Sequence, residues 1–127
     1  MCYRHSDSKI YGNRDKINGK ITYSVDEYSA NIDSIASILQ TKTKAKLIFL
    51  TTTYVPENEA GRFKKDPLVY NIAAKLIMEK HSIIVNDIYE QSMLIHNKFG
   101  KGSDDVHYTK EGYKELSKLV SNFIEAN

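Results

Sequence analysis

The feature that most constrains this chain is a mismatch between its helical segments and its strand segments. Three stretches carry apolar residues at helical spacing, and they begin at Ser24, at Asp66 and at Thr109. Between them lie two short apolar runs, Ala45–Thr52 (AKLIFLTT) and Ser82–Val85 (SIIV), whose pattern suits strands covered on both faces. This alternation predicts an α/β fold with a short parallel sheet and helices packed on its faces. Two strands cannot cover three amphipathic helices, so we expect either further strands in residues 1–23 or an incomplete sheet, and we favour the incomplete sheet.

Local signals predict where the helices begin. Ser24 and Glu27 have the spacing of a capping box, and the first helix should end near Gln40. Asp66 is expected to be the N-cap of the second helix, with Pro67 at its first position, and Thr109 should cap the last helix. The expected inner faces are Tyr28, Ile32, Ile35 and Leu39 in the first helix, Val69, Ile72, Ala73, Leu76 and Ile77 in the second, and Tyr113, Leu116, Leu119, Val120 and Phe123 in the third.

The other segments are predicted to be mostly loops. Residues 1–23 are polar and should lack regular elements, and Thr53–Lys65 is a polar loop. A short helix or turn should carry Ile88–Ile95, and Asn97–His107 should form a loop. The chain of 127 residues shows no repeat, so we expect a single domain over residues 1–127.

Charge and composition exclude several classes of partner. The net charge of +2 is too small to indicate nucleic acid or an anionic membrane, and no stretch approaches the length of a membrane span. The single cysteine, Cys2, permits no internal disulfide, and the four histidines lack zinc-ligand spacing, so no metal site is expected. The polar start of the chain, Met1–Lys9, lacks the apolar core of a signal peptide, which leaves the location of the protein open.

One short loop carries a pattern that suits acid–base chemistry. Asp104 stands three residues before His107, directly ahead of the helix that Thr109 caps. A histidine base needs a partner that fixes its tautomer and stabilises its protonated form, and a carboxylate in the same loop can do both. By itself, the spacing is more often found in a capping or solvated arrangement.

Several segments in order resemble the C-terminal part of SGNH (GDSL-type) ester hydrolases. The run DDVHYTKEGYKELSKLV, which includes Gly112-Tyr113, is similar to that family's final block, where Asp-x-x-His precedes the last helix. Leu47–Glu57 (LIFLTTTYVPE) and Arg62–Tyr89 also resemble family segments, so the likeness covers roughly residues 24–125. The resemblance implies a partial three-layer α/β/α fold of the flavodoxin-like SGNH type. It also implies that Asp104 orients the base and that His107 is the general base.

The chain departs from the family at the nucleophile. It contains no Gly-Asp-Ser and no Gly-x-Ser-x-Gly motif, and the oxyanion-hole glycine and asparagine have no clear counterpart. Cys2–Lys9 resembles a worn remnant of the family's asparagine block, with Asp7 and Lys9 in step and Cys2 at the asparagine position. We therefore expect no acyl-enzyme route, and no activity, from this chain alone.

Other residues are weaker candidates. Thr52 and Thr53 follow a strand, where open α/β folds bind ligands, so they are expected either to line the substrate cleft or to act as turn and capping hydroxyls. Arg62 can hold an acidic substrate, but one arginine in a loop is little support. Ser6 and Ser8, near His5 and Asp7, lack the rigid turn that presents a nucleophile. His81 is expected at a helix end and His96 on the surface.

Three interpretations follow. The first is a serine ester hydrolase lineage acting on acyl or acetyl esters, small or on carbohydrate, without a cofactor. The second is a non-catalytic binding or interaction module, and the third is a flavodoxin-like domain unrelated to ester chemistry. Because a sheet edge would be uncovered, we also expect exposed apolar surface there and self-association.

Overall fold

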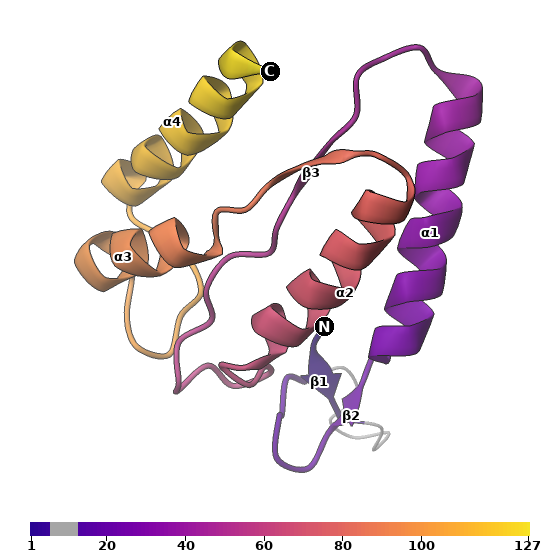
Figure 1. Ribbon diagram of the computed structural model, residues 1–127. Coiled ribbons are helices and arrows are strands. Elements are labelled where there is room, and N and C mark those ends of the chain that lie inside the picture. Colours follow the sequence, from indigo (N-terminus) through magenta and orange to yellow (C-terminus); the bar gives the residue numbers. More distant parts are fainter. Residues whose placement is uncertain (6–12) are drawn as a thin grey trace.

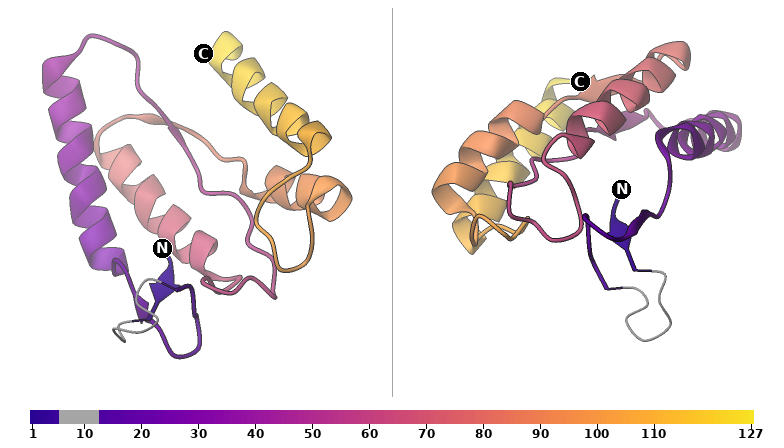
Figure 2. Two further views of the ribbon diagram at one scale, coloured as in Figure 1. Left: turned by 180° about the vertical axis from the view of Figure 1, so that it is seen from behind. Right: turned by 90° about the horizontal axis from the view of Figure 1, so that it is seen from below.

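A short parallel strand pair runs between two pairs of helices in the computed structural model, which describes residues 1–5 and 13–127 (Figures 1 and 2). Helices α1 and α2 lie on one side of the pair, and α3 and α4 lie on the other. The chain has a partial α/β fold, as its sequence predicts. The elements in chain order are β1 (Tyr3–Arg4), β2 (Lys20–Ile21), α1 (Val25–Lys42), β3 (Ile48–Leu50), α2 (Asp66–Lys80), β4 (Ile84–Asn86), α3 (Tyr89–Phe99) and α4 (Lys110–Ala126).

The parallel pair consists of β3 and β4. Ile48 pairs with Ile84, and Leu50 pairs with Asn86. The amide of Thr51 continues the ladder by donating to the carbonyl of Asn86 at 3.1 Å. Within the described residues β3 has a strand partner on one edge only, and an apolar groove of about 130 Å³ lies between this region and α1.

Capping side chains begin α1 and α4 where the sequence predicts. The hydroxyl of Ser24 accepts from the amide of Glu27 at 3.2 Å, and the Glu27 carboxylate accepts from the amide of Ser24 at 2.8 Å. Thr109 caps α4 by accepting from the amide of Gly112 at 3.3 Å. Both predictions are confirmed, although α1 continues to Lys42 rather than ending near Gln40.

The start of α2 differs from the prediction. Pro67 lies in the first turn as expected, but the N-cap residue is Lys65, and Asp66 already belongs to the helix. The carboxylate of Asp66 accepts from the amide of Phe63 at 2.8 Å. The prediction of Asp66 as N-cap was therefore wrong, because its side chain bonds backward to the preceding loop instead of forward to the first turn.

The N-terminal segment contains two short strands where only a loop was expected. β1 and β2 pair antiparallel, with Tyr3 opposite Ile21 and Arg4 opposite Lys20. They form their own two-stranded sheet and do not extend β3–β4. Since the pairing joins residues far apart in the sequence, no local pattern announces it. The predictions made for Ser6, Asp7, Ser8 and Lys9 concern residues outside the described part of the chain.

Element boundaries near the second strand also shift. Ser82, expected to open a strand, has φ of 54° and lies in the turn that follows the α2 cap His81. The strand begins only at Ile84. α3 is longer than expected and ends at Phe99, so the loop before α4 is correspondingly shorter than the predicted Asn97–His107.

The residues buried in α1 and α2 differ from the predicted ones. In α2, Tyr70, Ala74 and Met78 are buried, whereas Ile72 and Leu76 are 58% and 62% exposed. The reason is that α2 packs mainly against α1 and less against β4, so that the side facing α1 is covered and the stripe with Ile72 and Leu76 is not. In α1 the buried residue is Ala36, and the predicted Ile35 and Leu39 line the groove beside β3 with it but stay exposed. In α4 the predicted Tyr113 is exposed as well.

The best-buried region lies where the carboxyl ends of β3 and β4 meet the loops that follow. Tyr54, Val55, Ile88, Tyr89 and Tyr108 are buried there. Leu50 at the end of β3 is 42% exposed, while the apolar exposure expected at the strand edge stays a prediction. Among the described residues, no helix combines the length and the apolar character that crossing a bilayer requires.

Candidate active site

A closed loop between α3 and α4 carries His107. The loop is tied at its base by a bridge between Gly100 and Tyr108. The amide of Lys101 donates to the carbonyl of His107 at 3.0 Å, and the amide of Thr109 donates to the carbonyl of Phe99 at 2.8 Å. His107 therefore sits at the base of the loop, two residues before the α4 cap, where its backbone is fixed on both sides.

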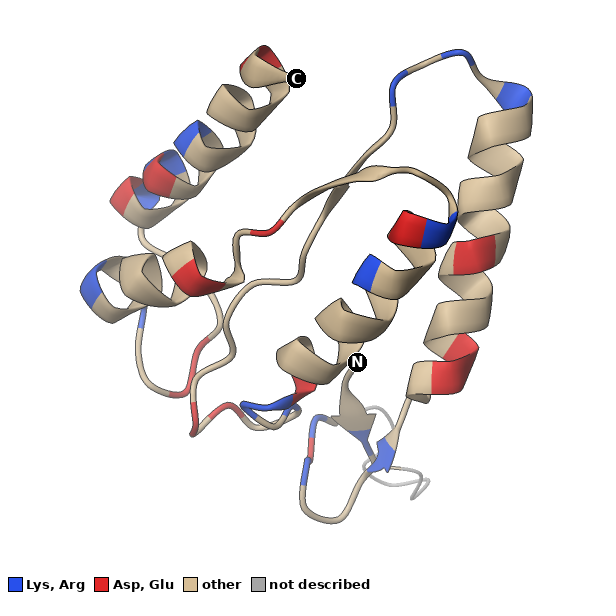
Figure 3. Cartoon of the chain, viewed as in Figure 1, with Lys and Arg blue, Asp and Glu red and all other residues tan. Residues whose placement is uncertain are grey.

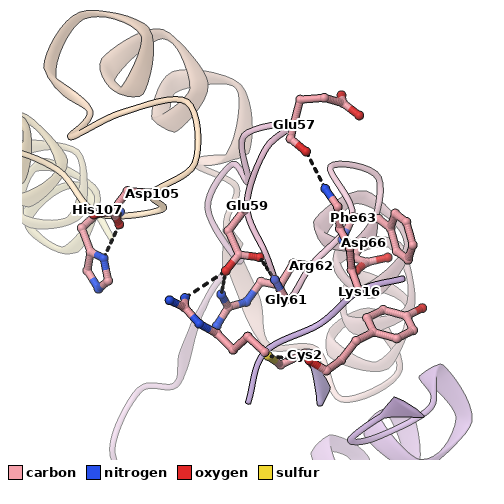
Figure 4. Close-up of polar contacts among 12 residues, drawn as sticks. Cys2, Lys16, Glu57, Glu59, Gly61, Arg62, Phe63, Asp66, Asp105 and His107 are labelled. Atoms are coloured by element: carbon pink, nitrogen blue, oxygen red, sulfur yellow. Dashed lines mark hydrogen bonds and ion pairs between the residues drawn. The ribbon is translucent and has the colours of Figure 1, made fainter. Parts of the chain in front are cut away.

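The ring of His107 is held by the carboxylate of Asp105 (Figure 4). Nδ1 lies 2.5 Å from Oδ1 of Asp105, and the His107 amide donates to the same oxygen at 2.9 Å. These bonds, first from the backbone N–H of His107 and then from its ring, lower the pKa of Asp105. With the Nδ1 proton engaged, Nε2 carries a lone pair that can accept a proton. The His107 side chain is 58% exposed, so a reacting group has access to it.

The sequence assigned the orienting role to Asp104, whereas the structure brings Asp105 into contact with the ring. Asp105 stands two residues before His107, which lets one carboxylate oxygen meet both the backbone and the ring, as in an Asx turn. Asp104 is exposed, and its side chain lies close to Gly102: a Cβ at that glycine would come within 2.9 Å of Oδ1 of Asp104. The assignment of Asp104 stays a prediction.

His96 is part of this site, although the sequence suggested a surface position. It is only 7% exposed, and its Nε2 donates to the backbone carbonyl of Asp105 at 2.7 Å. Its ring packs against Tyr54 and Tyr108, with centroids 5.4 and 5.2 Å away. The prediction of a surface residue was wrong. His96 follows Ser92 by four residues on the inner face of α3, and two polar residues on a buried stripe hide its apolar pattern.

Next to His96 lies an open cleft of about 340 Å³. Its walls come from the loop after β3, from the end of α3 and from the His107 loop. Aromatic and polar side chains both reach it. The lining residues are Tyr54, Pro56, Glu57, His96, Asn97, Gly100, Gly102 and Ser103.

The threonines after β3 mainly connect elements to one another. Thr51 is buried, and its hydroxyl donates to Asp87 at 3.0 Å and accepts from the amide of Ile88. Thr52 exchanges two backbone bonds with the side chain of Asn71, each 2.8 Å long. Thr53 hydrogen-bonds through its side chain to the phenol of Tyr108. Neither Thr52 nor Thr53 is among the residues that line the cleft, and their role in binding substrate stays a prediction.

A buried carboxylate lies on the loop that faces His107. The side chain of Glu59 is 0% exposed, and its Oε1 accepts from Arg14 at 3.0 Å and from Arg62 at 2.9 Å. Its neighbour Asn58 donates to Ser103 in the His107 loop, from the amide at 3.1 Å and from the side chain at 3.2 Å. Sequence reasoning noted only Arg62, because nothing local shows that Glu59 is buried or that Arg14, 45 residues earlier, reaches it.

Comparison with known proteins identifies the family. A sequence model described as GDSL-like Lipase/Acylhydrolase matches residues 5–120, which is most of the chain. No curated protein sequence matches this chain. The family match confirms the resemblance drawn from the Asp-x-x-His block and the segments before it. This chain therefore belongs to the GDSL-like lipases and acylhydrolases, a family of ester hydrolases.

Proposed function

We propose that the chain supplies the acid–base part of a serine ester hydrolase site, with His107 as the general base. The observation that carries this proposal is the contact of 2.5 Å between Nδ1 of His107 and the carboxylate of Asp105, together with the exposure of the His107 ring. A carboxylate on Nδ1 keeps the proton there and leaves Nε2 free to take one. The family match supports ester hydrolysis as the reaction.

In the proposed reaction, Nε2 of His107 takes the proton of a serine hydroxyl as the serine oxygen bonds to the ester carbonyl carbon. The tetrahedral intermediate then expels the alcohol, which receives that proton from Nε2. Water repeats both steps, releases the acid and restores the serine. The serine comes from a Gly-Asp-Ser block that this sequence does not contain.

We propose Asp104 and His107 as the catalytic pair, following the family pattern, and Asp105 as the competing carboxylate. Asp104→Asn and Asp105→Asn separate the two, since each removes one negative charge while preserving side-chain size. Both variants are made in the chain preceded by a Gly-Asp-Ser segment. If the family's Asp-x-x-His pattern holds, Asp104→Asn impairs its hydrolysis far more than Asp105→Asn. If the contact between Asp105 and His107 is the catalytic one, the order is reversed.

The substrate we propose is an acyl or acetyl ester, small or attached to carbohydrate. The aromatic and amide side chains that line the cleft, Tyr54 and Asn97 among them, suit a hydroxylated substrate. We also propose that Thr52 and Thr53 contribute to substrate binding.

The test is hydrolysis of p-nitrophenyl acetate by two proteins. The 127-residue chain alone is expected to match free imidazole. The chain preceded by a Gly-Asp-Ser segment, either encoded upstream or grafted from a family member, is expected to hydrolyse the ester, and His107→Ala should abolish this. Turnover by the chain alone that His107→Ala removes would show that a serine within it had been overlooked. A cooperatively folded extended protein that hydrolyses no ester would refute the proposal.

A second candidate is a binding module without catalysis, favoured by the missing serine and by the apolar groove beside β3. Among the residues that the structure describes, one edge of β3 has no strand partner, and this edge together with the exposed Leu50, Ile35 and Leu39 supports self-association there. Sedimentation velocity over a range of concentrations tests it. A monomer at all concentrations with a cooperative thermal transition would count against self-association.

A further inference from the structure

The cluster of Arg14, Glu59 and Arg62 holds more positive than negative charge. Both arginines donate to the same oxygen, Oε1 of Glu59, and the other oxygen accepts from the amide of Gly61 at 2.8 Å. A buried carboxylate needs a cation, and one guanidinium is enough to balance it. The second guanidinium therefore leaves the cluster with a net charge of +1.

The arginines remain accessible from solvent. The Arg14 side chain is 49% exposed and that of Arg62 is 27% exposed, whereas Glu59 beneath them is fully buried. Each guanidinium has five N–H donors, and the bonds to Glu59 come from Nη1 of each arginine. Donors remain on both groups while Glu59 fixes their positions, which lowers the entropy lost when a ligand binds.

Basic residues surround the cluster. Around Arg14, residues 13–21 contain Lys16 and Lys20 as further basic side chains and one acidic residue, Asp15, which is bonded to His5. Figure 3 shows basic residues on β1, on β2 and on the loop before α2, with acidic residues on the same loop and at the start of α2. Within the cluster itself the two guanidinium groups outnumber the one carboxylate that they contact, which favours an anionic group.

The cluster lies beside the loop that carries His107. Asn58, next to Glu59, makes both of its hydrogen bonds to Ser103 of that loop. In Figure 4, Glu59 and His107 extend from these neighbouring loops in the same direction. A molecule whose ester lies at Nε2 of His107 can therefore place another group toward the arginines.

We propose that Arg14 and Arg62, positioned by Glu59, bind a carboxylate of the substrate, so that the site selects esters of acidic molecules. The planar fork of donors on an arginine matches the two oxygens of a carboxylate. That the bound carboxylate belongs to the substrate rests on the proposed function, whereas binding of a carboxylate at this cluster does not depend on hydrolysis.

The test is a titration of the 127-residue chain with monomethyl succinate, followed by ¹⁵N NMR. This probe carries one ester and one carboxylate, and dimethyl succinate is its neutral counterpart. We expect monomethyl succinate to shift the Nε–H signals of Arg14 and Arg62 and the amide of Gly61, and dimethyl succinate to leave them in place. Equal shifts with both esters, or no saturable shift with either, would overturn the inference.

Two variants with the same loss of charge give the control. Arg14→Gln should weaken binding of monomethyl succinate about tenfold, the effect of losing one hydrogen bond between charged groups. Lys20→Gln should leave it unchanged. Equal weakening by both would show a diffuse field instead of a site. Should Arg14→Gln fail to fold, Arg14→Lys keeps the ion pair with Glu59 but lacks the fork, and unchanged binding by that variant would equally overturn the inference. If the extended enzyme hydrolyses neutral esters while the probe does not bind, this inference fails and the proposed function stands.

Discussion

Replacing Glu59 with glutamine should destabilise the chain far more than the same change at Glu57. Both substitutions remove one negative charge from the same loop. Glu59 is fully buried and bonded to Arg14 and Arg62, whereas the side chain of Glu57 is 74% exposed and its carboxylate lies 3.9 Å from Nζ of Lys64. The comparison isolates what burial adds to an ion pair.

The magnitude follows from the bonds of Glu59. Glutamine places an N–H₂ group where Oε2 now accepts from the amide of Gly61, so that buried amide loses its acceptor, at a cost of about 1–3 kcal/mol. The two guanidinium bonds then meet a neutral oxygen, which weakens each by about 0.5–1 kcal/mol. Arg14 and Arg62 are partly exposed and regain hydration, so the total should stay near 2–4 kcal/mol, at or below the cost of breaking a fully buried pair. Glu57→Gln should cost about 0–1 kcal/mol.

Urea denaturation followed by circular dichroism measures both free energies of unfolding. Equal slopes with different midpoints would show that stability, and not the unfolded state, has changed. If Glu59→Gln falls within about 0.5 kcal/mol of Glu57→Gln, the side chain is not held as described, and the argument that Glu59 positions the arginines is refuted.

Three further predictions concern other parts of the chain. His96→Phe should lower the free energy of unfolding by about 1 kcal/mol, because the hydrogen bond to the carbonyl of Asp105 is lost, and should shift the His107 ring signals in ¹⁵N NMR. His96→Gln keeps a donor and should shift these signals less. Unchanged signals in both variants would contradict the connection from His96 through Asp105 to His107. The carboxyl of Asp15, whose pKa is lowered to about 2 mainly by the backbone N–H of Asn18, should titrate near that value in ¹³C NMR. Because this pKa lies below its unfolded value, the stability it contributes is present above about pH 4 and is lost as pH falls through about 2; a midpoint near 4 would contradict the contact. Ser24→Ala should cost about 1 kcal/mol in thermal or urea unfolding by removing the capping box of α1, and no loss would show that α1 does not depend on it.

Features that depend on neighbouring residues were predictable from the sequence. The capping residues Ser24 and Thr109 act within three residues, and the apolar runs that became β3 and β4 are visible as such. The family match to residues 5–120 agrees with a resemblance drawn from motif order. These signals are short in range, so they do not depend on what packs against them.

Features that depend on tertiary packing were missed. The exposed stripe of α2, with Ile72 and Leu76, is as apolar as its buried face, and only the packing of α2 against α1 decides which one is covered. The burial of Glu59 depends on Arg14, which is remote in the sequence. The bond between Asp105 and His107 depends on how one loop turns, and two adjacent aspartates leave that undecided.

Side chains that join loops hold the site together, in addition to the bridge between Gly100 and Tyr108 at the base of the His107 loop. Asn58 joins the loop after β3 to Ser103, and His96 joins α3 to the carbonyl of Asp105. Glu59 joins the loop after β3 to the N-terminal segment through Arg14. Each connection ends within a few residues of His107 or of the arginines, and each lies at the carboxyl end of β3 and β4. The edge of β3 that has no strand partner in the described part of the chain, and the groove beside α1, are built from other residues. Any partner that pairs with that edge therefore extends the sheet without breaking the bonds that position His107.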